Sequence, residues 1–313
     1  MKKTAFLFPG QGSQVVGMAE DLHREFDYVR EIFDMTEEIT RLPIARLCFK
    51  GPMDELTQTV NLQPAVTAVN LALLAVLRRA NAGFASCAGH SLGEYSALHA
   101  GGVLTAEDTT RLVFLRGTLM HREAVRNQGA MQALVGLPIT DIEPIVAEAA
   151  ASGGVVSVAN HNSETQIVIT GSPDAVSRAG ALAAARGAKA VALKVSGAWH
   201  SELIRGAEAE FKAALAQVVF HAPEREIILN VTAEPGQDPV VIRDVMGRQL
   251  CSPVRWYDGM QRLVAAGVEV FVEVGPGRVL SGLMRKILPR DSTAQVHNVG
   301  TLAQVEAFLK AVA

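Results

Sequence analysis

The chain is poor in cysteine and in aromatic residues, and neither sign of charge dominates. Its 313 residues include three cysteines, which form no C-x-x-C pair, and only 5% of the residues are aromatic. Cysteines of this kind are expected as reduced thiols that pack like small hydrophobes, which indicates a reducing compartment. The net charge is −3, with acidic and basic residues interspersed. We therefore expect neither nucleic acid nor a membrane as a partner.

The chain also lacks a hydrophobic run suited to a signal peptide or a membrane span. The apolar residues 5–8 stop at Pro9-Gly10 and are too few for the core of a secretion signal. The longest apolar segment, residues 62–77, contains Gln63 and Asn70 and is predicted as a buried helix. We therefore expect a soluble, cytoplasmic protein.

The composition that remains favours an α/β fold. Hydrophobic residues make up 49% of the chain and 27 residues are glycine, which suits helices packed on a mostly parallel sheet. Four buried strands are predicted, at residues 4–8, 84–88, 226–231 and 268–274. Ligands bind beyond the carboxyl ends of such strands. Those ends carry Pro9-Gly10-Gln11-Gly12, Ser91, Asn230 with Thr232, and Gly275-Pro276-Gly277.

The middle of the chain predicts a second, smaller domain. Strand and helix patterns alternate there in the order β-α-β-β-α-β, at residues 130–135, 139–151, 155–159, 166–170, 173–186 and 190–195. This order is the ferredoxin-like split motif. We predict a small domain at 127–196 inserted into a discontinuous large domain, 1–126 and 197–313, with the ligand between them.

The segment Gly89-His90-Ser91-Leu92-Gly93 has the pattern of a nucleophile elbow. It lies between a predicted strand and a helix-like stretch at 94–100, and a strand-to-helix turn exposes a serine hydroxyl beside backbone N–H groups. The alternative is a chance match around a buried turn serine. Ser91 is the candidate nucleophile.

A serine nucleophile needs a base, and His200 is the best placed of the eight histidines. It follows the return from the predicted small domain and precedes a helical pattern, whose N-terminus would keep the ring neutral. The alternative for a lone histidine is a cap or a surface residue. His90 is interpreted as structural or supporting, because adjacent residues on a tight turn diverge. The histidines and cysteines show no metal-ligand spacing, so no metal is predicted.

Arg116 lies on the apolar face of a predicted helix opened by Thr105. That face carries Leu112, Leu115, Leu119 and Met120. A guanidinium pointing inward needs a carboxylate partner. An internal pair with Glu94 or Glu273 and a carboxylate on an acidic ligand are both open.

The glycine-rich loops do not match a nucleotide site. Gly10-Gln11-Gly12 and Gly275-Pro276-Gly277 both lack the third glycine of a dinucleotide fingerprint, and the chain has no Gly-Lys-Ser or Gly-Lys-Thr. Both loops are interpreted as allowing backbone to approach a reacting centre. The N–H groups of Gln11 and Leu92 are candidate oxyanion donors.

Six motifs occur in order along nearly the whole chain. They are Phe8-Pro9-Gly10-Gln11-Gly12-Ser13-Gln14, Gly89-His90-Ser91-Leu92-Gly93-Glu94-Tyr95, Arg116-Gly117, Val195-Ser196-Gly197-Ala198-Trp199-His200-Ser201, Arg248-Gln249-Leu250 and Glu273-Val274-Gly275-Pro276-Gly277. With these motifs the chain resembles the malonyl-CoA:acyl-carrier-protein transacylases. The resemblance implies an α/β-hydrolase-like large domain with a parallel central sheet and an inserted ferredoxin-like (βαββαβ) small domain.

The resemblance also implies roles for particular residues. Ser91 would be acylated, His200 would be the base, and Arg116 would bind the free malonyl carboxylate. Gln11 and Leu92 would supply the oxyanion N–H groups. Gln249 would orient the histidine through its backbone carbonyl.

Two further residues are expected to contact the substrate, Met120 and Trp199. An aromatic residue before the catalytic histidine resembles family members that take malonyl and exclude branched extenders. The alternative for Trp199 is simple packing of the crossover between the domains.

The implied reaction is a ping-pong transfer from malonyl-CoA to an acyl carrier protein, in fatty-acid or polyketide biosynthesis. CoA thioester is a substrate, so no cofactor is expected, and we expect a monomer. An acidic carrier could dock on Lys189 and Lys194. The alternatives are an acyl hydrolase acting on carrier-protein thioesters, against which Arg116 argues, and a non-catalytic carrier-docking subunit, against which intact Ser91 and His200 argue.

Overall fold

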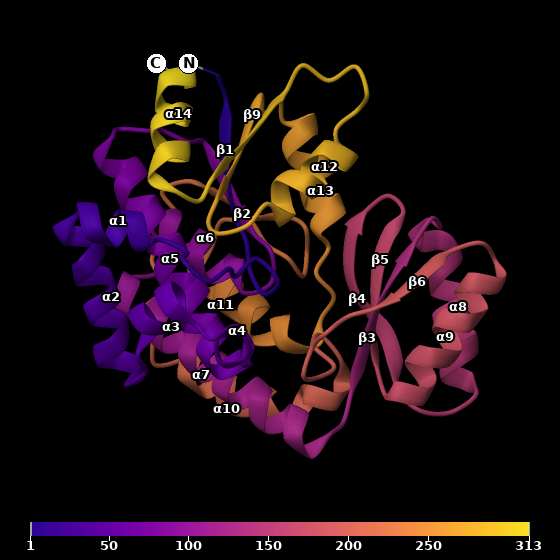
Figure 1. The fold of residues 1–313 in the computed structure, drawn as a ribbon. Coiled ribbons are helices and arrows are strands. Elements are labelled where there is room, and N and C mark those ends of the chain that lie inside the picture. The colour runs from indigo at the N-terminus through magenta and orange to yellow at the C-terminus, as the bar shows by residue number, and fades with distance from the viewer. Residues whose placement is uncertain (1, 313) are drawn as a thin grey trace.

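The computed structural model describes residues 2–312, and these form two β-sheets with helices around them (Figure 1). The larger sheet has the strand order β10-β9-β1-β2-β7-β8. Its strands are β1 (Thr4–Phe8), β2 (Ser86–Gly89), β7 (Glu226–Ile228), β8 (Pro235–Gly236), β9 (Val270–Val274) and β10 (Gln295–Val299). All neighbours pair in parallel except β7 with β8. The predicted α/β class is confirmed.

Helices cover both faces of this sheet. They are α1 (Glu20–Glu25), α2 (Asp27–Thr40), α3 (Ile44–Lys50), α4 (Met53–Thr57), α5 (Thr59–Arg79), α6 (Gly93–Ala100), α7 (Ala106–Arg126), α10 (Glu208–Leu215), α11 (Pro239–Arg248), α12 (Trp256–Ala265), α13 (Val279–Ile287) and α14 (Leu302–Val312), with 3₁₀ turns η1 (Glu202–Ala207) and η2 (Gln249–Cys251). Side chains alternate along β1, so Phe6 and Phe8 join the core that contains α5 and α7, whereas Ala5 and Leu7 pack with α12 and α13.

The predicted buried helix is confirmed as part of α5. This helix is long and apolar enough to cross a membrane by length and composition, but 89% of its most apolar stretch is buried inside the fold. It is a core helix that packs along α7.

Two strands of the larger sheet were not predicted. β10 has the sequence Gln-Val-His-Asn-Val and is mostly half-exposed at a sheet edge, so it lacks the apolar run that marks a buried strand. β8 has only two residues. The predicted strand at 226–231 is shorter in the structure because the chain turns after β7, where the N–H of Leu229 donates to the carbonyl of Glu234.

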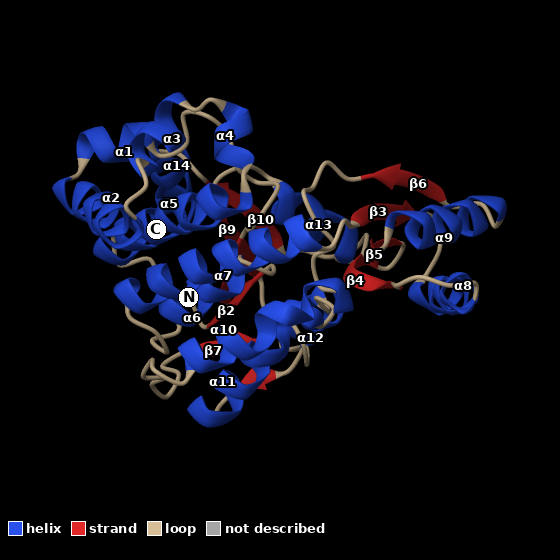
Figure 2. Ribbon diagram, turned by 90° about the horizontal axis from the view of Figure 1, so that it is seen from below, coloured by secondary structure: helices blue, strands red, loops and turns tan. Residues whose placement is uncertain are grey.

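The second sheet is antiparallel, with the order β4-β5-β3-β6. Its elements are β3 (Ala130–Val135), α8 (Ile139–Ala151), β4 (Val156–Ser163), β5 (Gln166–Gly171), α9 (Pro173–Ala185) and β6 (Lys189–Ala192). Figure 2 shows α8 and α9 beside this sheet, with which they share a separate apolar core. The predicted βαββαβ order is confirmed. β4 continues four residues beyond the predicted end, through irregular pairing with β5.

The extension of β4 brings the small sheet against the larger part of the molecule. Val254, just before α12, donates to the carbonyl of Ala159 at 2.8 Å and accepts from the N–H of His161 at 2.9 Å. These bonds hold the end of β4 against the segment that follows η2.

Candidate active site

Ser91 lies on a tight turn between β2 and α6. Its φ is 52°, in the left-handed region that a non-glycine residue adopts only under constraint. The flanking glycine is required because the turn is so close to β1: a Cβ on Gly93 would lie 2.0 Å from the carbonyl oxygen of Phe8. The predicted elbow geometry is therefore present.

The strained turn is held by Asn230, which follows β7. Its side-chain oxygen accepts from the N–H of Ser91 at 2.7 Å, and its side-chain NH₂ donates to the carbonyl of Gly89 at 2.7 Å. Asn230 thus bonds both sides of the elbow. Asn230 was predicted at this edge of the sheet, but no role for it was predicted.

His200 meets Ser91 from the return crossover. The Oγ of Ser91 lies 2.8 Å from Nε2 of His200. The other ring nitrogen, Nδ1, lies 3.0 Å from the carbonyl oxygens of both Gln249 and Ser252. Since carbonyls only accept, Nδ1 carries the hydrogen and Nε2 is free to accept the serine proton. The contact with Ser252 was not predicted.

The electrostatics of the site keep His200 neutral. Burial, followed by the nearby charge of Arg116, lowers the pKa of His200 from 6.5 to about 3. From the sequence, we predicted that the N-terminus of a following helix would keep the His200 ring neutral. The structure gives burial as the main cause, and the turn that follows His200 is the 3₁₀ helix η1.

The N–H groups of Gln11 and Leu92 are the candidate oxyanion donors. Neither donates a hydrogen bond to another residue within 2–312. Both residues line the same cavity as Ser91. Two free N–H groups beside a nucleophile match the requirement for stabilising a tetrahedral oxyanion.

Arg116 projects from α7 into the site and is 1% exposed. Its Nη2 donates to the Oγ of Ser91 at 3.1 Å, its Nη1 to Gln63 Oε1 at 3.0 Å, and its Nε to Gln249 Oε1 at 3.2 Å. Burial lowers the pKa of Arg116. Its partners are neutral.

The internal ion pair considered for Arg116 does not form. Within residues 2–312 no carboxylate oxygen lies within 4.0 Å of its guanidinium. Glu273 instead accepts from the N–H groups of Leu280 and Ser281, at 2.9 and 2.8 Å. A buried cation of this kind is suited to an anionic ligand.

The cavity in front of Ser91 has a volume of about 110 Å³. It is lined by Gln11, His90, Ser91, Leu92, Arg116, Met120, Met131, Asn160, Leu193, Val195, Trp199 and His200. Seven of the eight predicted site residues are among them, and the eighth, Gln249, lies behind Ser91 and His200. Sequence reasoning missed Met131, Asn160, Leu193 and Val195, which come from the small sheet and the crossover after it.

Met120, Trp199 and His90 line the same cavity, and each has contacts outside the group of Ser91, His200 and Arg116. Met120 accepts a hydrogen bond at its sulfur from Gln63 at 3.2 Å. Trp199 is 5% exposed and packs over Gly197. His90 turns away from the serine hydroxyl, and its Nε2 donates to Asn162 Oδ1 at 2.7 Å.

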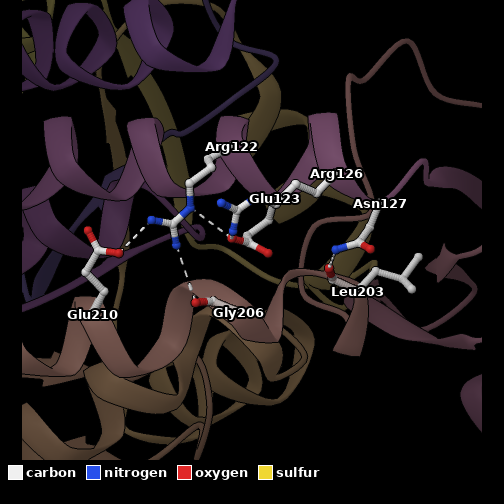
Figure 3. Close-up of polar contacts among 7 residues, drawn as sticks. All are labelled: Arg122, Glu123, Arg126, Asn127, Leu203, Gly206 and Glu210. Carbon is white, nitrogen blue, oxygen red and sulfur yellow. Dashed lines mark hydrogen bonds and ion pairs between the residues drawn. The ribbon is translucent and has the colours of Figure 1, made fainter.

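A polar cluster at the end of α7 ties the helix that carries Arg116 to the turn after His200 (Figure 3). Arg122 donates to the buried carboxylate of Glu123 at 2.9 Å and to Glu210 of α10 at 2.6 Å. It also donates to the carbonyl of Gly206 in η1 at 3.4 Å. Asn127 donates to the carbonyl of Leu203 at 2.9 Å. These contacts fix α7 relative to the segment that follows His200.

Comparison with known proteins agrees with this geometry. The family model described as "Acyl transferase domain" matches residues 5–309. The chain is 38% identical to the malonyl CoA-acyl carrier protein transacylase of Bacillus subtilis (strain 168), covering 99% of this chain and 98% of that protein.

Solved structures are equally similar. The crystal structure of an acyl carrier protein S-malonyltransferase from Vibrio cholerae has a TM-score of 0.92 and 41% identity, covering 98% of this chain and 99% of that one. A malonyl-transacylase solved in complex with a type II PKS acyl-carrier protein has a TM-score of 0.93 and 37% identity, covering 99% of both chains.

Proposed function

Because the chain belongs to the malonyl CoA-acyl carrier protein transacylase family, we propose that it moves the malonyl group of malonyl-CoA to the phosphopantetheine thiol of an acyl carrier protein. The observation that carries this proposal is the setting of the Ser91 hydroxyl. It lies between a neutral imidazole nitrogen at 2.8 Å and a buried guanidinium, with no carboxylate partner in residues 2–312, at 3.1 Å.

In the first half-reaction Ser91 Oγ attacks the thioester carbonyl of malonyl-CoA while Nε2 of His200 takes its proton. The oxygen of the tetrahedral intermediate is stabilised by the N–H groups of Gln11 and Leu92, each worth on the order of 10² to 10³ in rate. The carbon–sulfur bond then breaks, and the imidazolium returns the proton to the departing CoA sulfur. A malonyl-serine ester and free CoA result.

In the second half-reaction the carrier's phosphopantetheine thiol gives its proton to His200 and attacks the ester. The carbon–oxygen bond breaks and Ser91 recovers its proton, which leaves the malonyl thioester on the carrier. Both steps are acyl exchanges with proton transfer and move no electrons between redox states. We therefore propose no metal and no cofactor, since malonyl-CoA, a CoA thioester, is a substrate.

Arg116 accounts for the choice of acyl group. The free carboxylate of a malonyl group can pair with its guanidinium, which residues 2–312 leave without a carboxylate partner. An acyl hydrolase for neutral chains gains nothing from a buried cation beside its nucleophile. The transferase is favoured over the hydrolase for that reason.

The test is acyl-enzyme formation followed by intact mass spectrometry. Wild-type protein mixed with malonyl-CoA should gain the mass of one malonyl group, and adding a carrier protein should remove it. Ser91→Ala should gain none. An ester that hydrolyses as fast without carrier as with it would favour the hydrolase, and no ester at all would favour a docking subunit.

The carrier surface is proposed to include Lys189 and Lys194, which are exposed at and after β6. Acidic carriers are attracted by such charges. Charge reversal at both positions should raise the KM for the carrier and leave malonyl-CoA loading unchanged. An unchanged carrier KM would remove these lysines from the interface. We further propose that the enzyme acts as a monomer in the cytoplasm.

A further inference from the structure

Glu94 is a fully buried carboxylate that the proposed reaction does not use. It lies in the first turn of α6, three residues after Ser91. Its Oε1 accepts from the N–H of Asn230 at 2.7 Å, and its Oε2 accepts from the side-chain NH₂ of Gln249. Both contacts reach residues that hold the catalytic groups in place. Burial raises the pKa of Glu94 to about 7, and the contacts with Asn230 and Gln249 oppose this rise.

The side chain of Gln249 connects Glu94 to Arg116. Its NH₂ also donates to the carbonyl of Ser91 at 3.0 Å, while its Oε1 accepts from Nε of Arg116 at 3.2 Å. A carboxylate and a carbonyl only accept hydrogen bonds, so Glu94 and the Ser91 carbonyl together hold the NH₂ end of the amide on their side. The oxygen end of Gln249 must then face the guanidinium.

Above about pH 7, where Glu94 is ionised, the same arrangement supplies Arg116 with a balancing charge. A buried guanidinium is costly without an anion nearby, and no carboxylate in residues 2–312 contacts it directly. Glu94 is separated from Arg116 by one amide group. A direct pair would occupy the guanidinium, and an incoming carboxylate would have to displace it.

We propose that Glu94 is a positioning residue for acyl selectivity, which fixes the direction of the Gln249 amide and balances the charge of Arg116 while leaving the guanidinium able to bind the carboxylate of the acyl group. This role rests on the proposed malonyl transfer. It assigns to Glu94 an effect on the choice between charged and neutral acyl groups, beyond a contribution to stability.

The direct test is Glu94→Gln, assayed by single-turnover acylation with malonyl-CoA and acetyl-CoA. The substitution removes the charge and one of the two acceptors that hold the NH₂ of Gln249, the other being the Ser91 carbonyl, so the malonyl-to-acetyl rate ratio should fall on the order of tenfold. Equal losses with both thioesters would overturn the proposal. Wild-type acylation by malonyl-CoA, measured alongside, shows separately whether the proposed function holds.

Glu273 offers a matched control. It is also fully buried, but it accepts two hydrogen bonds from the backbone of α13 and a longer one, at 3.5 Å, from the side chain of Asn298. Glu273→Gln should lower the melting temperature without changing the malonyl-to-acetyl ratio. A similar fall in that ratio for both variants would mean that any buried charge loss has this effect, which contradicts the proposal.

A second variant tests the route through Gln249 and remains informative if Glu94→Gln fails to fold. Gln249→Met removes the amide but keeps the length of the side chain and the backbone carbonyl. It should lower the malonyl-to-acetyl ratio as Glu94→Gln does. In the double variant the two effects should be less than additive, because part of the effect of Glu94 acts through the Gln249 amide. An unchanged ratio in Gln249→Met, or additive effects in the double variant, would overturn the proposal.

Discussion

The two walls of the cavity are built differently. On the large sheet's side, Ser91, His200 and Arg116 each make at least two hydrogen bonds to fixed partners. On the side of the small sheet, Asn160 contributes an amide that makes no side-chain hydrogen bond with other residues in 2–312, and its neighbours in the lining are apolar. Reactive groups are held rigidly by one wall, and the other wall is suited to shaping the space for the substrate.

The largest effect is expected from the rigid wall, at His200. His200→Ala removes the only group in residues 2–312 that lies within hydrogen-bond distance of Ser91 Oγ and is placed to accept its proton. The acylation rate should fall on the order of 10⁴ or more. Stopped-flow or quenched-flow acylation with malonyl-CoA measures it. A loss below tenfold would mean that another base serves Ser91.

The second largest effect is expected from substitution of Arg116. Arg116→Met keeps much of the buried volume but removes the charge, so malonyl loading should fall on the order of 10² to 10³ while acetyl loading falls less. Competition between malonyl-CoA and acetyl-CoA, read by intact mass, gives the ratio. Equal losses for both would show that Arg116 only supports the fold.

Substitution of Asn160 tests the wall of the cavity on the side of the small sheet. The side-chain amide of Asn160 has no hydrogen-bond partner within residues 2–312, so its removal leaves no other polar group unsatisfied. Asn160→Ala should therefore lower kcat/KM by less than about tenfold, mainly through the KM for malonyl-CoA. The matched variant Asn162→Ala breaks the existing bond to His90. A loss of malonyl loading in Asn160→Ala as large as that in Arg116→Met would contradict this difference between the walls.

Trp199 tests whether the cavity selects by shape. It lines the cavity and precedes His200. Trp199→Ser should enlarge the space beside the acyl group and raise the rate ratio of methylmalonyl-CoA to malonyl-CoA by several-fold, since one methyl group is worth roughly 10-fold or more in a tight pocket. An unchanged ratio would assign Trp199 to packing alone.

The smallest effect is on stability in acid. The pKa of His200 is lowered to about 3 by burial and Arg116, so below pH 6.5 the unfolded chain binds a proton that the folded protein does not. Stability from this group is complete above pH 6.5 and falls as the pH drops toward 3. Between pH 7 and 5, His200→Gln should lose about 2 kcal/mol less than wild type in urea unfolding, at roughly 1.4 kcal/mol per pH unit. Equal losses would contradict a neutral, buried ring.

The parts of the fold and of the site that local sequence patterns encode could be predicted from the sequence. The elbow around Ser91 and the βαββαβ order depend on short-range periodicity and turn residues. The contacts of Glu94 and Asn160 depend on residues far apart in the chain, brought together only by tertiary packing. β10 was missed because a polar edge strand has no apolar signature.

The most direct test of the proposed mechanism is to locate the malonyl group after a brief reaction with malonyl-CoA, by proteolysis and tandem mass spectrometry. The proposed mechanism requires a single malonyl ester on Ser91, absent in Ser91→Ala and discharged by a carrier thiol. Malonyl on another residue, or carrier loading that persists in Ser91→Ala, would contradict it.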